Sequence, residues 1–273
     1  MPNPDPQIKR PLVSVITVVF NGEIHLQEAI NSIRLQSYYP IEYIVIDGGS
    51  SDGTLEIISR NEDIISRWVS EADGGIYDAM NKGIRMASGK YIGLLNADDI
   101  LISDAVKRVV DALEALGEPG YTCGAVELID QLGRRFGVSK PMPENLRHKR
   151  RFLEMPCPHL GVFVHRAIYD QLGLFDTRFK VSADYDFLLR LIEGNVPSSE
   201  IYQPIGKYRV GGASGGIITF IETFSVHLIH NAGFFRSFYS FLRSLLKSNA
   251  AHLLPGALKK ALNKTSSSKN SYD

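Results

Sequence analysis

Hydrophobic and polar positions along the first hundred residues form blocks that predict strands separated by helices. Residues 12–19 are mostly β-branched and lie between Pro11 and the pair Asn21-Gly22, a pattern typical of a buried strand. Similar apolar blocks follow at 41–46, 64–69 and 91–95. Apolar residues recur at helical spacing over 26–33 and 76–87, and 54–58 predicts a short helix. Strands that alternate with helices predict right-handed βαβ units.

The second hundred residues have a looser pattern. After a helix over 105–116, strands at 121–129 and 134–139 flank a short turn, which predicts a hairpin. A strand at 160–165, helices at 166–172 and 184–193, and a strand at 201–210 complete the pattern. The predicted fold class is α/β, with a Rossmann-like, mostly parallel central sheet flanked by helices and followed by a C-terminal helical extension.

Composition adds segment boundaries and excludes some partners. We expect a flexible N-terminus at 1–10, two halves of one domain at 11–115 and 116–212, a helical extension at 213–262 and a disordered tail at 263–273. Thirty basic and thirty acidic residues leave no net charge, so nothing indicates nucleic acid as a partner. The N-terminus lacks the apolar core of a signal peptide, and Cys123 and Cys157 lack metal or redox spacing, which favours the cytoplasm.

The C-terminal segment is basic and aromatic. Residues 217–273 contain seven Lys or Arg and two acidic residues, interspersed with Phe and Leu. Such amphipathic helices suit the surface of an anionic membrane, here the inner face of the plasma membrane, and packing against the domain explains the apolar residues equally well. No uninterrupted apolar run reaches the length of about 18 residues that a membrane span needs.

Candidate chemistry gathers where the predicted strands end. The strand at 91–95 is followed by Asn96, Asp98 and Asp99, at the edge where open α/β sheets bind ligands. Closely spaced hard oxygen ligands, too few to fill a shell, suit a divalent cation that also needs substrate phosphates. The plain alternative is a capped loop before the next helix. Asp47 ends the second strand and can accept the imide N–H of a uracil, although Asp-Gly-Gly-Ser is also an ordinary tight turn.

Four motifs together resemble the family 2 glycosyltransferases of GT-A fold. They are Val-Ile-Thr-Val-Val-Phe-Asn-Gly at 15–22, Ile-Asp-Gly-Gly-Ser-Ser-Asp-Gly-Thr at 46–54, residues 81–89, and Leu-Asn-Ala-Asp-Asp at 95–99. Residues 73–83 are similar to the branch that assembles bacterial surface polysaccharides and glycolipids. The resemblance covers roughly 11–210. It implies inverting transfer of a sugar from a nucleoside diphosphate sugar, with UDP favoured, to a hydroxyl of a glycan or lipid-linked acceptor.

The resemblance also implies roles for residues of the first half, which would bind the nucleotide sugar. Thr17, Asn21 and Asp47 would line the nucleoside pocket, and Asp98 would hold Mg²⁺ or Mn²⁺ against the diphosphate. Asn96 stands in place of the first acid of the family's Asp-x-Asp, which favours a ribose contact for it. Met80 occupies the place of a frequent Arg, so Lys82 would supply the positive charge.

The second half would bind the acceptor. Asp184 aligns with the general base of the family, Ala183 replaces the preceding acid, and Asp186 is the second choice. A carboxylate at a helix start is also an ordinary cap. His159 would contact acceptor or phosphate, or be a hydrogen-bonded core histidine, and Arg209 would reach the diphosphate or lie at the surface. The segment 211–216 would form a lid.

Two other function classes compete with this hypothesis. A nucleotidyltransferase also joins a nucleotide to a metal on an α/β sheet, but residues 20–23 lack its Gly-rich, Arg-containing loop. A non-catalytic module that binds a sugar nucleotide or glycan needs neither acid, whereas this chain has both Asp98 and Asp184.

Overall fold

The computed structural model describes residues 10–211, 217–234 and 237–240. Most of the predicted N-terminal segment, all of the 211–216 lid except Gly211, the extension beyond Ser240 and the tail at 263–273 lie outside the described residues.

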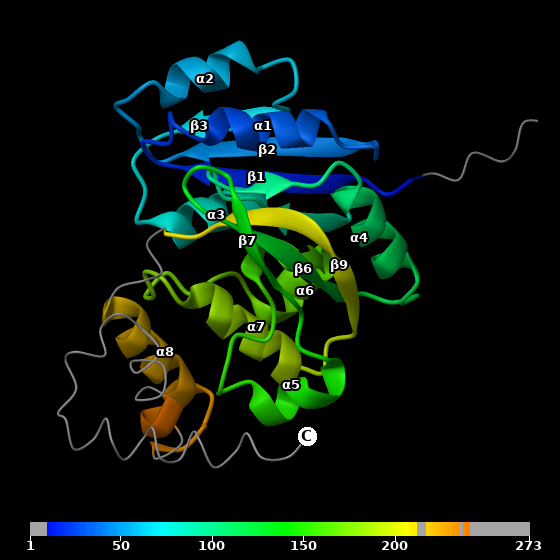
Figure 1. Cartoon of the computed structure of the whole chain (residues 1–273), viewed down its shortest axis with the longest axis vertical. Coiled ribbons are helices and arrows are strands. Elements are labelled where there is room, and N and C mark those ends of the chain that lie inside the picture. The colour runs from blue at the N-terminus through cyan, green and yellow to red at the C-terminus, as the bar shows by residue number, and fades with distance from the viewer. Residues whose placement is uncertain (1–9, 212–216, 235–236, 241–273) are drawn as a thin grey trace, which may run out of the picture.

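One nine-stranded sheet runs through both halves of the chain (Figure 1). Its order is β3-β2-β1-β4-β8-β6-β9-β5, and β7 pairs with β6. The strands are β1 Val13–Val19, β2 Ile41–Asp47, β3 Arg67–Ser70, β4 Tyr91–Leu94, β5 Ile100–Leu101, β6 Tyr121–Ile129, β7 Arg135–Ser139, β8 Phe163–His165 and β9 Ser198–Arg209.

The first four strands confirm the predicted βαβ half. β1 pairs in parallel with β2 and β4, and β2 pairs in parallel with β3. The second half joins through β8, which is antiparallel to β4. At this seam a Cβ on Gly93 would lie 2.1 Å from the ring of Phe163, so the two strands meet there only because residue 93 has no side chain. The predicted hairpin is confirmed as β6 and β7.

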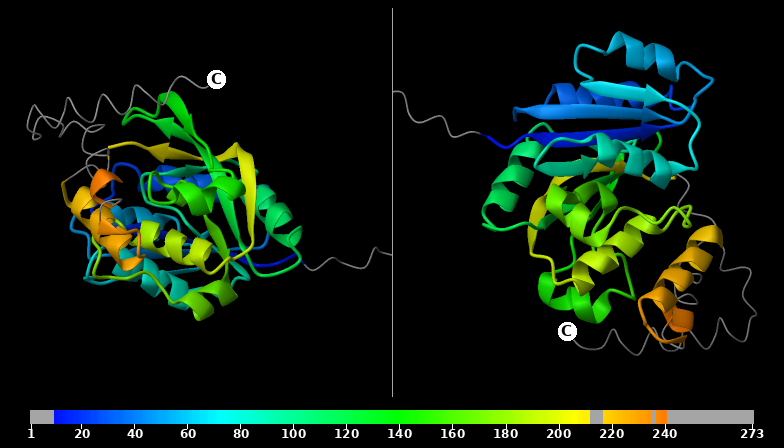
Figure 2. Two further views of the ribbon diagram at one scale, coloured as in Figure 1. Left: turned by 90° about the horizontal axis from the view of Figure 1, so that it is seen from below. Right: turned by 180° about the vertical axis from the view of Figure 1, so that it is seen from behind.

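Helices cover both faces of the sheet (Figure 2). One hydrophobic core lies under α1, α2 and α4, and a second lies under α3, α6 and α7, with Val226 of α8 packed against it. The helices are α1 Leu26–Arg34, α2 Thr54–Arg60, α3 Ile76–Met86, α4 Ala105–Glu114, α5 Glu144–Arg150, α6 Arg166–Leu172, α7 Ala183–Glu193 and α8 Ile217–Ile229. Within the described segments, none of them has the length and apolar character needed to cross a bilayer.

Three elements depart from the predicted pattern, and one of them is the two-residue strand β5, which pairs with β9 and was not predicted. The strand expected at 160–165 begins instead with a 3₁₀ turn, His159–Gly161, because the N–H groups of Gly161 and Val162 bond locally to Pro158 and His159. Helix α5 was not predicted, since Glu-Asn-Leu-Arg-His-Lys-Arg contains a single apolar residue. Its anchor is polar: Arg147 is buried and its guanidinium bonds to the carbonyl of Met142.

Candidate active site

A cavity of about 980 Å³ opens where the parallel strands end. Its wall contains the loops after β1, β2, β3 and β4, so it lies at the carboxyl edge of the sheet. The second half of the chain supplies the facing wall with His159, Lys180 and Asp184, and Arg209 from that half lies beside Asp98. Asp98 and Asp184, which the sequence places in opposite halves, therefore line the same cavity.

The loops after β1 and β2 in the cavity wall are joined by hydrogen bonds. The N–H of Asn21 donates to Ser50 Oγ at 2.7 Å, and Asn21 Oδ1 accepts from the N–H of Ser51 at 2.9 Å. Asn21 adopts a left-handed backbone conformation with φ of 49°. A Cβ on Gly48 would lie 2.6 Å from Asp73 Oδ2. The backbone of Gly48 and the carboxylate of Asp73 therefore lie side by side in the wall.

Three residues expected at the nucleotide do not line this cavity. Thr17 is fully buried within β1, where its hydroxyl accepts from the hydroxyl of Tyr43 at 2.9 Å. Asp47 is also fully buried, and its carboxylate accepts from the N–H of Ser50 and the hydroxyls of Ser50 and Ser70. Lys82 forms an ion pair with Glu71, with Nζ 2.5 Å from Oε1. In this structure the side chain of Asp47 supports the turn that carries Gly48, whereas Thr17 bonds to Tyr43 within the sheet.

The loop after β4 presents its polar side chains in two directions. Asn96 and Asp98 line the cavity, whereas Asp99 turns inward and is 1% exposed. Asp99 Oδ1 accepts from the N–H of Arg209 at 3.0 Å. Burial, together with the charge of Asp98, raises the pKa of Asp99 to about 8. Asp99 therefore connects the loop to the backbone of Arg209 and does not line the cavity.

Arg209 holds this loop from behind. Its side chain is 2% exposed, Nε donates to the carbonyl of Asp98 at 3.1 Å, and Nη2 is 2.8 Å from Glu28 Oε2. Nη1 donates to the carbonyls of Asp130 and Gln131. Because all three nitrogens bond to protein oxygens, the guanidinium ties β9 and α1 to the metal-ligand candidate Asp98.

The loop after β4 is suited to bind a cation that a substrate also coordinates. Searched over the described residues, no group of three or more His, Cys, Asp and Glu side chains could hold a metal ion. However, Asn96 Oδ1 is buried without a hydrogen-bond partner, and Asp98 lines the same wall. An amide oxygen and a carboxylate suit Mg²⁺ or Mn²⁺ when phosphate oxygens and water complete the shell.

Asp184 begins the first turn of α7 on the opposite wall. Oδ1 accepts from the hydroxyl of Tyr77 and from the N–H of Tyr185, both at 2.9 Å. Oδ2 lies 3.9 Å from His159 Nδ1. Burial lowers the pKa of His159, although the charge of Asp184 opposes this shift, so the imidazole is neutral at pH 7.

Asp186 is not part of this wall. Its carboxylate is buried between Arg190 Nε at 3.0 Å and His230 Nε2 at 2.9 Å. These bonds connect α7 to the segment after α8. The structure therefore places Asp186, the second choice for the base, away from the cavity. Residues two positions apart on a helix point in different directions, so Asp184 and Asp186 do not face the same side.

Three buried polar atoms of cavity-lining residues lack partners in the part of the chain that the structure describes. They are His25 Nδ1, Asn96 Oδ1 and His159 Nε2. A buried polar atom without a hydrogen bond is costly, so these atoms are suited to bond to a ligand. The sequence patterns predicted no role for His25, Asp73, Tyr77 or Lys180. Two of these residues, Asp73 and Tyr77, lie in the segment 73–83 that resembles one branch of the family.

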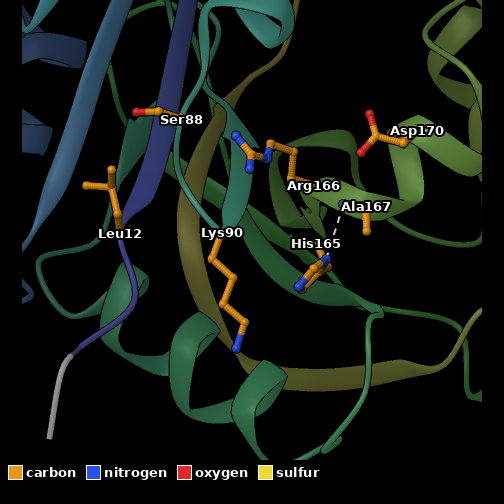
Figure 3. A pocket seen from close by; sticks show the side chains of 7 residues that line it. All are labelled: Leu12, Ser88, Lys90, His165, Arg166, Ala167 and Asp170. Carbon is orange, nitrogen blue, oxygen red and sulfur yellow. Dashed lines mark hydrogen bonds between the residues drawn. The ribbon is translucent and has the colours of Figure 1, made fainter.

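A second cavity, of about 380 Å³, lies at the opposite edge of the sheet, beside the starts of β1 and β4 (Figure 3). Its polar side chains have structural roles. Lys90 Nζ is 2.7 Å from Glu114, and His165 Nδ1 accepts from the N–H of Ala167 at the start of α6. This cavity is remote from the candidate acids.

Two relatives with known names are glycosyltransferases that are similar to this chain over about two thirds of its length. An uncharacterized glycosyltransferase of Mycobacterium tuberculosis is 39% identical over 184 residues, covering 66% of this chain and 68% of the relative. A PGL/p-HBAD biosynthesis glycosyltransferase of Mycobacterium bovis is 31% identical over 187 residues, covering 66% and 69%.

Solved structures share the fold at low sequence identity. S. aureus TarS 1–349, in complex with UDP-GlcNAc, matches with a TM-score of 0.63 at 17% identity, covering 88% of this chain and 68% of that one. The chain spans 41% of full-length TarS. The mannosyltransferase PcManGT of Pyrobaculum calidifontis, in complex with GDP-Man and Mn²⁺, matches with a TM-score of 0.59 at 18% identity, covering 97% and 82%.

The family model described as glycosyl transferase family 2 matches residues 14–173, more than half of the chain. This range contains the loops after β1 to β4, which line the cavity. The chain therefore belongs to glycosyl transferase family 2 and is a glycosyltransferase with the GT-A fold.

Proposed function

We propose that this chain is an inverting glycosyltransferase that moves a sugar from a nucleoside diphosphate sugar to an acceptor hydroxyl in polysaccharide or glycolipid synthesis. The observation that carries the proposal is that Asp98 and Asp184 line one cavity from opposite halves of the chain. The nucleotide half is 11–115 and the acceptor half is 116–212. Family membership favours glycosyl transfer over nucleotidyl transfer, and the two acids favour catalysis over simple binding.

The transfer step assigns one role to each wall. The carboxylate of Asp184 accepts the proton of the acceptor hydroxyl, and the freed oxygen forms a bond to the anomeric carbon. The bond from that carbon to the diphosphate oxygen breaks on the opposite face, so the configuration inverts and the nucleoside diphosphate leaves. Asp98, with Asn96 beside it, would hold Mg²⁺ or Mn²⁺, which supplies positive charge to the departing diphosphate.

A uridine donor is the one that we favour, on the resemblance of the motifs and on the nucleotide of a structural neighbour. The carboxylate of Asp73 lies against Gly48 in the wall, where it can accept the imide N–H of a uracil. S. aureus TarS has been solved with UDP and UDP-GlcNAc. Asn21 and Asn96 belong to the same wall, and Asp47 supports the turn after Gly48 through its hydrogen bonds to Ser50.

A panel of UDP-, dTDP- and GDP-sugars, each tested with Mn²⁺, with Mg²⁺ and with EDTA, checks the donor. A ligand that binds only the folded protein at about 100 times its Kd stabilises it by roughly 2.7 kcal/mol, or a Tm increase on the order of 5–10 °C. We expect this increase with a UDP-sugar plus metal and a smaller one with EDTA. An equal response to GDP-sugars would refute the uridine preference, and no response to any donor would refute the proposal.

A lipid-linked acceptor at an anionic membrane is the acceptor that we favour. The described part of α8 and the segment after it expose Ile218, Ile221, Leu228, Ile229 and Phe234. Residues 217–273 also have an excess of basic residues, and a mycobacterial relative is named for glycolipid biosynthesis. Glu222 of α8 accepts from the N–H groups of Lys180 and Val181 in the cavity wall, so the start of this helix lies close to the cavity.

Co-sedimentation with lipid vesicles tests the membrane proposal. We expect the full chain to pellet with vesicles that contain anionic lipid, and to be released by high salt, because basic residues near an anionic surface contribute about 1 kcal/mol each. Changing Ile218 and Ile221 to Ser should weaken this binding severalfold. Equal recovery with anionic and zwitterionic vesicles, or none with either, would contradict it.

A further inference from the structure

Tyr77 connects the donor wall of the cavity to the candidate base. It is the second residue of α3, and its hydroxyl donates to Asp184 Oδ1 at 2.9 Å across 107 positions of sequence. The ring is 6% exposed and packs on Phe175 with a centroid distance of 5.6 Å. Because the ring is held by the core, the hydroxyl is fixed in place before any substrate binds.

The two oxygens of Asp184 are consequently unequal. Oδ1 accepts two hydrogen bonds, from Tyr77 and from the N–H of Tyr185. Across the described residues Oδ2 accepts none, since His159 Nδ1 at 3.9 Å is too distant for a hydrogen bond. A base must come within hydrogen-bond reach of the proton it removes, and Oδ2 is the oxygen that has this freedom.

We propose that Tyr77 is a positioning residue that clamps Asp184 Oδ1, so that Oδ2 alone takes the proton of the acceptor hydroxyl. This inference rests on the proposed function, because it assumes that Asp184 is the base. In this arrangement Tyr77 orients Asp184, as a third group orients the base in a catalytic triad.

The protonation of Tyr77 is compatible with this role. Burial, reinforced by the charge of Asp184, raises the pKa of Tyr77 far above its ordinary value. The phenol therefore remains a neutral donor across the whole pH range in which the enzyme works.

Tyr77→Phe removes the hydroxyl and keeps the ring. We expect kcat to fall about 10- to 100-fold, as when a group that orients a reacting residue is lost. The KM for the donor and the metal-dependent Tm increase with donor should remain unchanged. In an Asp184→Asn background the same substitution should have no further effect.

Tyr169→Phe is the matched control. Tyr169 packs on the same Phe175 ring, with centroids 6.4 Å apart, and is equally buried, but it does not line the cavity. Tyr169→Phe should leave kcat unchanged. A kcat within twofold of wild type for Tyr77→Phe, or an equal loss for Tyr169→Phe, would overturn the positioning role. If Asp184→Asn itself is active, the base assignment fails, which is a different result from failure of the clamp alone.

Discussion

Asp184→Asn is expected to lower kcat by about a thousandfold, because general-base catalysis contributes typically 10²- to 10⁴-fold. The amide keeps the size of the carboxylate and can still accept the hydrogen bond from Tyr77, so the fold should be retained. It cannot take the proton from the acceptor hydroxyl. Steady-state transfer to the acceptor, with donor binding followed separately by the Tm increase, distinguishes loss of chemistry from loss of binding.

Asp170→Asn is the control for this substitution. Asp170 is exposed beside the second cavity, at the opposite edge of the sheet. The same chemical change there should leave transfer within twofold of wild type. If Asp184→Asn transfers sugar at more than a tenth of the wild-type rate, Asp184 is not the general base, even if the variant still binds the donor.

Asp98→Ala is expected to abolish the part of donor binding that depends on metal and to lower kcat about 10²- to 10³-fold. A metal ion stabilises the charge on a leaving diphosphate by several kcal/mol, which corresponds to that range of rates. The substitution removes the one carboxylate of the loop that lines the cavity, since Asp99 faces inward to the backbone of Arg209. Titration of Mn²⁺ in the presence of donor, followed by Tm, measures the effect.

Asp111→Ala provides the comparison for Asp98→Ala. Asp111 lies on α4, where it forms an exposed ion pair with Lys107, and such pairs contribute little to stability. Its loss should change neither the Mn²⁺ response nor kcat. If Asp98→Ala retains a wild-type response to Mn²⁺, the cation is held elsewhere or is not used.

The sequence predicted the sheet well where apolar runs are long. Strands β1 and β2 coincide with runs of β-branched residues. The loops that follow them lie together at the carboxyl edge of the sheet. Asn96 and Asp98 were recognisable because polar side chains end a buried strand. Helix α5 was missed because its stability depends on the buried guanidinium of Arg147 rather than on an apolar face.

Side-chain roles were harder to predict than elements. Thr17 and Asp47 stand at the expected positions of their strands, yet each is held within the protein by hydrogen bonds, to Tyr43 and to Ser70 respectively. Sequence spacing does not tell which face of a central strand opens to a cavity. The contact between Tyr77 and Asp184 joins residues from two halves of the chain, and no local pattern reports such a pair.

The anchoring of Arg209 has a consequence for engineering. One way to build a hybrid enzyme is to exchange the proposed acceptor half for that of another transferase, with a join near residue 116. In this chain such an exchange would also remove the guanidinium that bonds to the Asp98 carbonyl and to Glu28. A graft that brings a new acceptor specificity must therefore bring an arginine at this position as well, or the donor site will be damaged by a change made far from it.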